Sequence, residues 1–244
     1  MTINPKMNNP FLAITCFKTG FALLTKSQLR KYLLIPILIN IVLYALGFSL
    51  SYLYLSELIN HFIPDWLNWL RWLLWPIFFI SFLMLTFFTF TLLANLLASP
   101  FYGKLSEQAL GIISGKPPVI HDQPIIKVLL GELHRLMYLG IRCLPLLVIS
   151  IIPGINFIAP VLWGIFAAWG IAMEYFSYPL ENSGLVFKDQ LAQLKTVRWA
   201  ALSLGGLAML ALSIPILNLF VSSATVIAAT AYWYQLNGGE VQQH

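Results

Sequence analysis

Charged residues are scarce in this chain of 244 residues. Only 9% of the chain is Asp, Glu, Lys or Arg, whereas 59% is hydrophobic. A soluble domain contains about 25% charged and about 45–50% apolar residues. Because so few charges cannot cover the surface of a folded protein in water, the composition excludes a soluble globular domain. It indicates an integral membrane protein.

Residues that carry enzymatic or metal chemistry are also few. The cysteines Cys16 and Cys143 form no motif and are too few for a disulfide framework. The four histidines are scattered, and the sequence contains neither a metal-binding histidine pair nor a glycine-rich nucleotide loop. No nucleophile–base pair is visible either. We therefore expect no catalytic residue, no metal, no cofactor, no use of ATP and no nucleic-acid partner.

Two long uncharged blocks predict membrane-spanning helices. The first block, residues 32–55, predicts a spanning helix over 32–57, since 24 helical residues measure ~36 Å and the hydrocarbon core is ~30 Å thick. The second block, 73–98, continues as a helical pattern, so we expect one long helix over 66–110 with a kink at Pro100. Between the blocks, tryptophans recur every third residue from Trp66 to Trp75, which is typical of an interfacial aromatic belt.

Two amphipathic segments follow in the second half of the chain. Over residues 125–142, basic and polar side chains fall on one helical face and aliphatic side chains on the other. Residues 183–198 show a similar, shorter pattern. Both segments predict helices that lie along the lipid headgroups.

A weak internal repeat predicts two helical hairpins. The segment 152–157 resembles the segment 214–219, and in each a proline and an asparagine interrupt an apolar run. The apolar run 144–152 is nine residues, or ~14 Å of helix, which is too short to cross a bilayer. We expect both hairpins to enter the membrane, turn near its middle and return. Ordinary spanning helices with kinks are the alternative.

The predicted fold is an all-α integral membrane protein with two long transmembrane helices, two partially penetrating helical hairpins and interfacial amphipathic helices. We expect a single membrane domain over residues 1–244. Its N-terminal part is a basic segment over 1–31, followed by two spanning helices over 32–57 and 66–110. Two units of an amphipathic helix plus a hairpin follow, over 125–178 and 183–236. This arrangement places every net-basic segment on one face, in accord with the positive-inside rule.

Basic residues at the start of the first predicted helix form a candidate anion site. A helix N-terminus favours an anion through its N–H groups and its positive dipole end. Arg30 adds a planar fork suited to a tetrahedral oxyanion, and Lys31 adds a point charge. Spacing alone favours a simpler interpretation, because basic residues flank most cytoplasmic helix starts.

Several polar residues fall at membrane depth. Asn156 and Asn218 either cap the broken hairpin turns or face a pathway. Glu174 is either an interfacial residue or a pathway residue.

A series of short motifs resembles the CysZ-type sulfate transporter family. Each motif is weak alone, but their order and spacing agree over roughly residues 18–235. The motifs are Trp66–Leu70, Leu74–Pro76, Ser99–Gly103 with Glu107 and Gln108, Ile152–Ile155, Ala159–Trp163, Tyr175–Pro179 with Asn182, and Ile214–Phe220.

The resemblance implies a multi-pass protein of the bacterial inner membrane that takes up sulfate for cysteine biosynthesis without ATP hydrolysis. It also implies homo-oligomers, dimers or larger, including arrangements with protomers in opposite orientations. The lipid bilayer and sulfate are the remaining expected partners. The alternatives are a channel or carrier for another small oxyanion, such as sulfite or thiosulfate, and a non-transporting membrane interaction protein.

The resemblance also suggests site residues. The family's short anion-binding stretch maps onto Gln28, Leu29, Arg30 and Lys31. Here Gln28 replaces a glycine, whose backbone approaches an anion closely, and Lys31 replaces an arginine with bidentate geometry. The pathway is predicted to be lined by Asn95, Glu107, Gln108 and Arg142.

Overall fold

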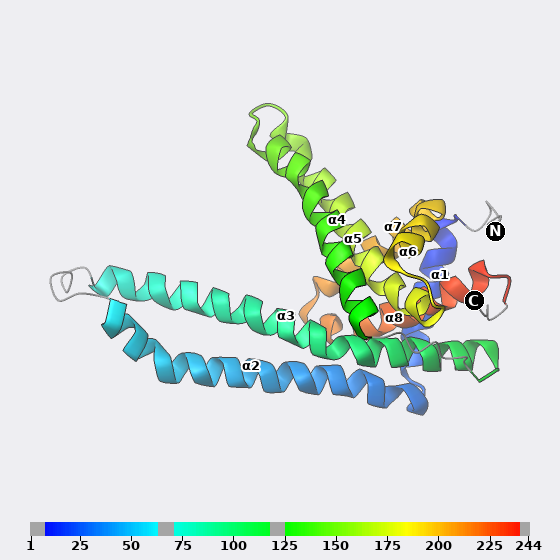
Figure 1. The fold of residues 1–244 in the computed structure, drawn as a ribbon, viewed down its shortest axis with the longest axis horizontal. Helices are drawn as coiled ribbons and strands as arrows, with labels where there is room; N and C mark the ends of the chain where they lie inside the picture. The colour runs from blue at the N-terminus through cyan, green and yellow to red at the C-terminus, as the bar shows by residue number, and fades with distance from the viewer. Residues whose placement is uncertain (1–7, 63–70, 118–124, 240–244) are drawn as a thin grey trace. The chain divides into compact units, whose positions relative to one another are not determined.

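The computed structural model describes residues 8–62, 71–117 and 125–239, and all regular structure within these ranges is helical. The prediction of an all-α protein is therefore confirmed. The elements follow one another along the chain as shown in Figure 1. Their bounds are α1 Pro10–Leu24, α2 Ser27–Phe62, α3 Arg71–Ser114, α4 Ile125–Ile151, the 3-10 helix η3 Asn156–Ile158, α5 Ala159–Asn182, α6 Phe187–Thr196, α7 Arg198–Leu212 and α8 Pro215–Leu236.

Three stretches within the described ranges are long and apolar enough to cross a membrane. They are Ser27–Leu50 in α2, Leu130–Ile151 in α4 and Asn156–Asn182 across η3 and α5. These stretches confirm the membrane character that the composition predicted. In α3 the described apolar stretch is the shorter Trp75–Leu85, so a crossing by α3 stays a prediction.

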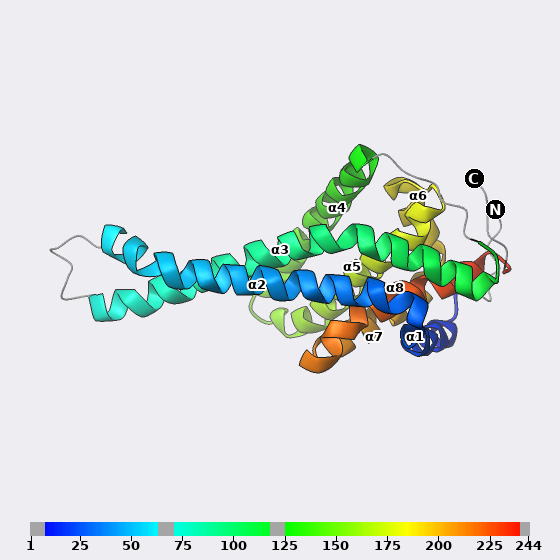
Figure 2. The same ribbon diagram turned by 90° about the horizontal axis from the view of Figure 1, so that it is seen from below.

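The chain divides into two compact units. One unit is residues 34–101, which contains most of α2 and the larger part of α3. Its two helices run antiparallel in both views of Figures 1 and 2, and α3 continues without a break through Pro76 and Pro100. The tryptophans Trp66 and Trp69 of the predicted aromatic belt lie outside the described residues.

The other unit contains the chain up to residue 33 and from residue 102 onward. Its core is formed by α1, α5, α7 and α8, which pack against one another. The contacts are made largely by small side chains: Ala172, Ala201, Ala224 and Ala228 are fully buried. Closely packed small residues are how helices associate in membranes, where no hydrophobic effect drives helix against helix.

Helix α1 lies within the segment that was predicted only as a basic N-terminal stretch. Asn9 caps it by accepting a hydrogen bond from the Phe11 N–H at 2.9 Å, and Pro10 occupies its first position. The Asn8 side chain accepts from the Trp199 N–H, also at 2.9 Å, and so joins the start of α1 to α7. Helix α1 is thus part of the folded core.

The first predicted hairpin differs from expectation in its first arm. We expected a separate interfacial helix over 125–142 and a short membrane arm after it, but α4 continues unbroken from Ile125 to Ile151. Pro145 lies inside this helix. Membrane helices tolerate proline because local adjustments and neighbouring groups satisfy the backbone carbonyl that it leaves without a donor. The prediction of two separate segments there was wrong.

Both predicted interruptions are present as breaks between helices. Residues 152–155 form the first turn, in which Gly154 has a positive φ of 86°. Ser213 and Ile214 form the second, and Pro215 begins α8, where a proline is well tolerated. No side-chain hydrogen bond caps η3, α5 or α8, so the interpretation of Asn156 and Asn218 as caps was wrong.

Candidate anion site

The first turn of α2 contains the predicted anion-binding residues. Helix α1 ends at Leu24 and α2 begins at Ser27, so Thr25 and Lys26 form the turn between them. Two hydrogen bonds close this turn: the Thr25 hydroxyl donates to the Ala22 carbonyl at 2.8 Å, and the Lys26 N–H donates to the Leu23 carbonyl at 3.0 Å. The first spanning helix was predicted to begin at residue 32, whereas α2 begins five residues earlier, at Ser27.

Burial fixes which way this turn faces. Leu29 is fully buried, and its N–H donates to the Lys26 carbonyl at 3.0 Å. Gln28, Arg30 and Lys31 are exposed. The aliphatic side chain thus packs the turn into the protein, while the amide and the two cations stay accessible to a ligand.

The electrostatics of the turn favour an anion. The first turn of α2 contains no acidic residue, and the helix dipole adds partial positive charge there. Lys26, which was not part of the predicted site, is exposed directly before the helix and adds a third cation. The Lys31 ammonium lies 4.9 Å from the centre of the Tyr32 ring. Three cations and the free backbone donors of a helix N-terminus therefore belong to one exposed turn, a combination that favours an anion.

Two predicted pathway residues, Glu107 and Gln108, are half-buried in the last part of α3. This part packs within the larger unit. The neighbouring Ser106 hydroxyl is buried and lies 2.8 Å from the Thr230 hydroxyl of α8, and the Asn182 amide donates to the Gly103 carbonyl at 2.9 Å. These hydrogen bonds position Glu107 and Gln108 beside α5 and α8. The side chain of Asn95, another predicted pathway residue, lies outside the described part.

Arg142 lies elsewhere, in a groove with two other cations. Its guanidinium carbon is 4.0 Å from the centre of the Tyr138 ring on the preceding turn of α4. The groove is lined by Arg142, Lys195 and Arg198 together with mostly apolar side chains of α4, α5 and α7. Within the described residues, its lining includes none of Gln28–Lys31, Glu107 and Gln108. The structure therefore does not bring the predicted site residues into one pocket.

A polar cluster between α4, α5 and α6 was not predicted from the sequence. Arg135 forms an ion pair with Glu132 and also interacts electrostatically with Glu174 and Glu181. The Gln190 side chain of α6 hydrogen-bonds Glu181. Only the pairing of Glu132 with Arg135, three residues apart on one helix, could have been found from spacing.

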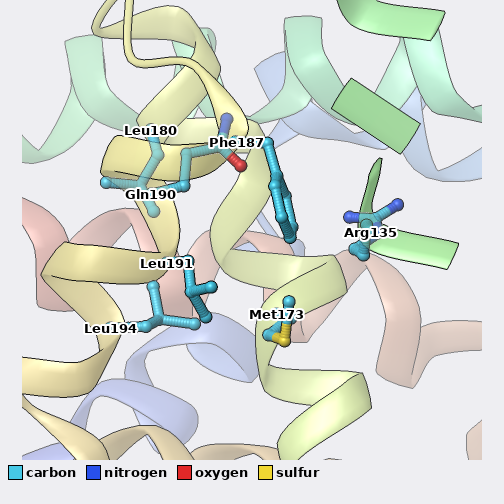
Figure 3. Close-up of a pocket in the computed structure, with 7 residues that line it drawn as sticks. All are labelled: Arg135, Met173, Leu180, Phe187, Gln190, Leu191 and Leu194. Carbon is cyan, nitrogen blue, oxygen red and sulfur yellow. The ribbon is translucent and has the colours of Figure 1, made fainter. Parts of the chain in front are cut away.

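Figure 3 shows the small pocket beside this cluster, lined by Arg135, Met173, Leu180, Phe187, Gln190, Leu191 and Leu194. Its volume is about 10 Å³, which is room for one water molecule at most. Sulfate does not fit there. The charges of the cluster therefore join α4, α5 and α6.

Comparison with known proteins agrees with the motifs. Residues 16–222 match the family described as Sulfate transporter CysZ/Etoposide-induced protein 2.4. The chain belongs to this family. The Sulfate transporter CysZ of Pseudomonas paraeruginosa is 37% identical over 228 residues, covering 90% of this chain and 93% of that relative. The Sulfate transporter CysZ of Salmonella typhi is 38% identical over 236 residues, covering 92% of each. The predicted family is thus confirmed.

Proposed function

We propose that this protein transports sulfate across the bacterial inner membrane, without ATP hydrolysis, and supplies cysteine biosynthesis. The observation that carries the proposal is the match to relatives named Sulfate transporter CysZ over nine-tenths of the chain. The all-helical fold, with several stretches able to span a membrane, suits a transporter.

Sulfate is recruited, in this proposal, at the first turn of α2. Gln28, Arg30 and Lys31 are exposed there, and Leu29 is buried and fixes their direction. Arg30 provides a pair of parallel N–H donors, and the helix end provides backbone donors. Because a dianion is prohibitively costly in hydrocarbon, its path beyond this site needs water or polar side chains. Glu107 and Gln108, with Asn95, are the proposed lining.

The two hairpins, in this proposal, enter the membrane without crossing it. Helix α7 has 15 residues, or ~22 Å, less than the ~30 Å of the hydrocarbon core. In the first hairpin, Arg142 marks the depth of the headgroups, and the nine residues after it in α4 reach only ~14 Å further. The tip is apolar and exposed, with Ile151 at 78% and Phe157 at 76%, as suits contact with acyl chains.

The first hairpin is also braced internally. The Trp163 indole N–H donates to the Ser150 hydroxyl at 3.0 Å, which joins α5 to α4 near the first tip. We propose that protomers carrying these hairpins assemble into homo-oligomers, dimers or larger, and that the pathway runs inside the assembly.

Uptake of radiolabelled sulfate into proteoliposomes of the pure protein tests the function. We expect uptake down a sulfate gradient without ATP, reduced severalfold in an Arg30→Ala variant that is equally well folded. Unlabelled sulfite and thiosulfate, added in turn, show which oxyanion competes best. Transport would be contradicted if uptake did not exceed that of protein-free liposomes. Strict dependence on added ATP would contradict the proposed mechanism. A stronger flux of another oxyanion would contradict sulfate as the substrate.

A further inference from the structure

The groove that contains Arg142 has two chemically different ends. Its cations are Arg142 on α4, Lys195 at the end of α6 and Arg198 at the start of α7, and all three are exposed. The rest of the lining is Pro145, Leu146, Leu162, Ile165, Phe166, Trp169 and Leu202, with no acidic residue. The groove therefore combines a positive patch with an apolar wall.

The order of these residues along the helices separates the two ends. Leu146 follows Arg142 by one helical turn, and Leu202 follows Arg198 by one turn, so each pair lies on one face of its helix. In both cases the apolar residue is the one nearer the hairpin turn, at 152–155 or at 213–214. On α5, Leu162 and Ile165 also lie near the first turn. On α4 and on α7, the apolar wall thus extends from the cation toward the hairpin turn.

We propose that this groove binds an anionic phospholipid, with the lipid phosphate against Arg142, Lys195 and Arg198 and an acyl chain along the wall of Leu146, Leu162, Ile165 and Leu202. Basic pockets between membrane helices are suited to anionic headgroups. The groove volume of about 580 Å³ lies within the roughly 300–1,000 Å³ of small-molecule sites, so the groove has room for the headgroup phosphate and part of one acyl chain.

The geometry around Arg142 supports a headgroup ligand. The Tyr138 ring lies under its guanidinium and packs edge-on against Phe187 of α6 at 6.0 Å. This stack restrains the arginine at the mouth of the groove and leaves its N–H edges directed away from the ring face. Trp169 in the wall and the exposed Trp199, next to Arg198, are the aromatic residues expected where headgroups meet acyl chains.

Sulfate fits this groove poorly by comparison. A small dianion needs hydrogen-bond donors on most of its sides, whereas seven of the ten lining residues are aliphatic, aromatic or proline. An acyl chain gains from the same wall, since each buried CH₂ is favourable. Free phosphate would bind through the cations only, whereas a complete lipid would also gain affinity from the apolar wall. A contribution of the wall to the affinity therefore distinguishes the two ligands.

Lipid-exchange native mass spectrometry on the full-length protein tests the proposal. The probes are dioleoyl-phosphatidylglycerol, dioleoyl-phosphatidylcholine and inorganic phosphate alone. We expect at least about tenfold preference for phosphatidylglycerol over phosphatidylcholine, and about fivefold weaker binding for each of Arg142→Gln, Lys195→Gln and Arg198→Gln. Lys188→Gln, which removes an exposed cation of α6 outside the groove, is the matched control and should bind like the native protein.

Two further measurements locate the ligand and its chain. Leu146→Gln and Leu202→Gln should weaken phosphatidylglycerol severalfold and leave weak binding of inorganic phosphate unchanged. Phosphatidylglycerol brominated on its acyl chains should quench tryptophan fluorescence, and Trp169→Phe should remove part of that quenching. Equal affinity for both lipids, equal phosphatidylglycerol binding in the three cation variants, or inorganic phosphate binding as tightly as the lipid would each overturn the proposal.

Discussion

A Cβ atom added to Gly205 of α7 would lie 2.0 Å from the carbonyl oxygen of Ala168 in α5. The same atom would lie 2.9 Å from the backbone nitrogen of Ala172. Both neighbours are backbone atoms, which cannot move aside as the end of a flexible side chain can. The two helices therefore touch through their backbones, an approach that only glycine permits at this position.

We expect Gly205→Ala to destabilise the protein, by roughly 1–3 kcal/mol or more, because the two helices must separate to admit one methyl group. Gly206→Ala is the matched control one residue along, where an added Cβ would be 3.9 Å from the Ala168 side chain, an ordinary contact. The measurement is thermal unfolding in detergent, followed by loss of the monodisperse peak in size-exclusion chromatography. Equal melting of the two variants would show that α5 and α7 are not this close.

A second close approach joins α1 to α8. A Cβ on Gly20 would lie 2.2 Å from the Ala224 carbonyl oxygen, so Gly20→Ala should lower the melting temperature in the same assay. Gly140→Ala is the control, since Gly140 has open space around it in α4 and alanine there improves helix propensity by about 1 kcal/mol. If Gly20→Ala melted like the native protein, α1 would not be part of the core.

Periodicity and charge predicted the long apolar helices but not α1. The stretch 10–24 is apolar and shorter than a bilayer crossing, and its lysine and neighbouring basic residues made the whole segment resemble a flank of the first span. Its capping residue, Asn9, followed by Pro10 was a local signal that could have been recognised. That α1 packs on α8 was not predictable, because the contact depends on Gly20 and Ala224 meeting across about 200 residues of chain.

The candidate sites show the same division between local and distant relationships. The exposed turn of Gln28, Arg30 and Lys31 was predictable because its residues are contiguous. The groove was not, because Arg142 and Arg198 come together only through the packing of α4, α5 and α7. The polar cluster of Arg135, Glu174 and Glu181 was missed for the same reason.

The depth of the hairpin tips is tested by cysteine labelling. Cys143→Ser provides the background, since the remaining Cys16 is 1% exposed and burial raises the pKa of its thiol to about 11, which keeps it unreactive. Phe157→Cys and Leu217→Cys replace exposed tip residues. We expect both to react with an impermeant maleimide at least about tenfold more slowly than Lys116→Cys, because a thiol in hydrocarbon does not ionise.

The labelling is measured from each side of the membrane in turn, in intact and in permeabilised vesicles, so that protomers of either orientation are sampled. Unfolding in detergent should restore full labelling of both tips. Rapid labelling of both tips, from the side opposite to Lys116, would establish complete crossings and would contradict the partial hairpins.

The anion site makes the sharpest prediction about a single side chain. A hydrogen bond to a charged group contributes about 1.5–3 kcal/mol, so Arg30→Ala should weaken sulfate binding roughly tenfold to a hundredfold. Lys31→Ala should cost less, because a flexible and strongly hydrated ammonium holds an oxyanion less rigidly. Lys31→Arg should equal or exceed the native affinity. Isothermal titration of sulfate into monodisperse protein is the measurement.

Arg30→Lys separates an anion site from a purely topological role. This variant keeps the positive charge that orients the helix but loses the bidentate fork, so it should bind sulfate nearly as weakly as Arg30→Ala while inserting and expressing normally. If Arg30 only set the orientation of α2, Arg30→Lys would bind like the native protein, and Arg30→Ala would change insertion instead.

Gln28→Gly adds an independent check on the same turn. It should strengthen binding if the exposed side chain limits approach to the backbone N–H groups, and weaken binding if the amide itself donates to sulfate. Unchanged affinity in Arg30→Ala, Arg30→Lys and Gln28→Gly together would remove the first turn of α2 from the sulfate pathway.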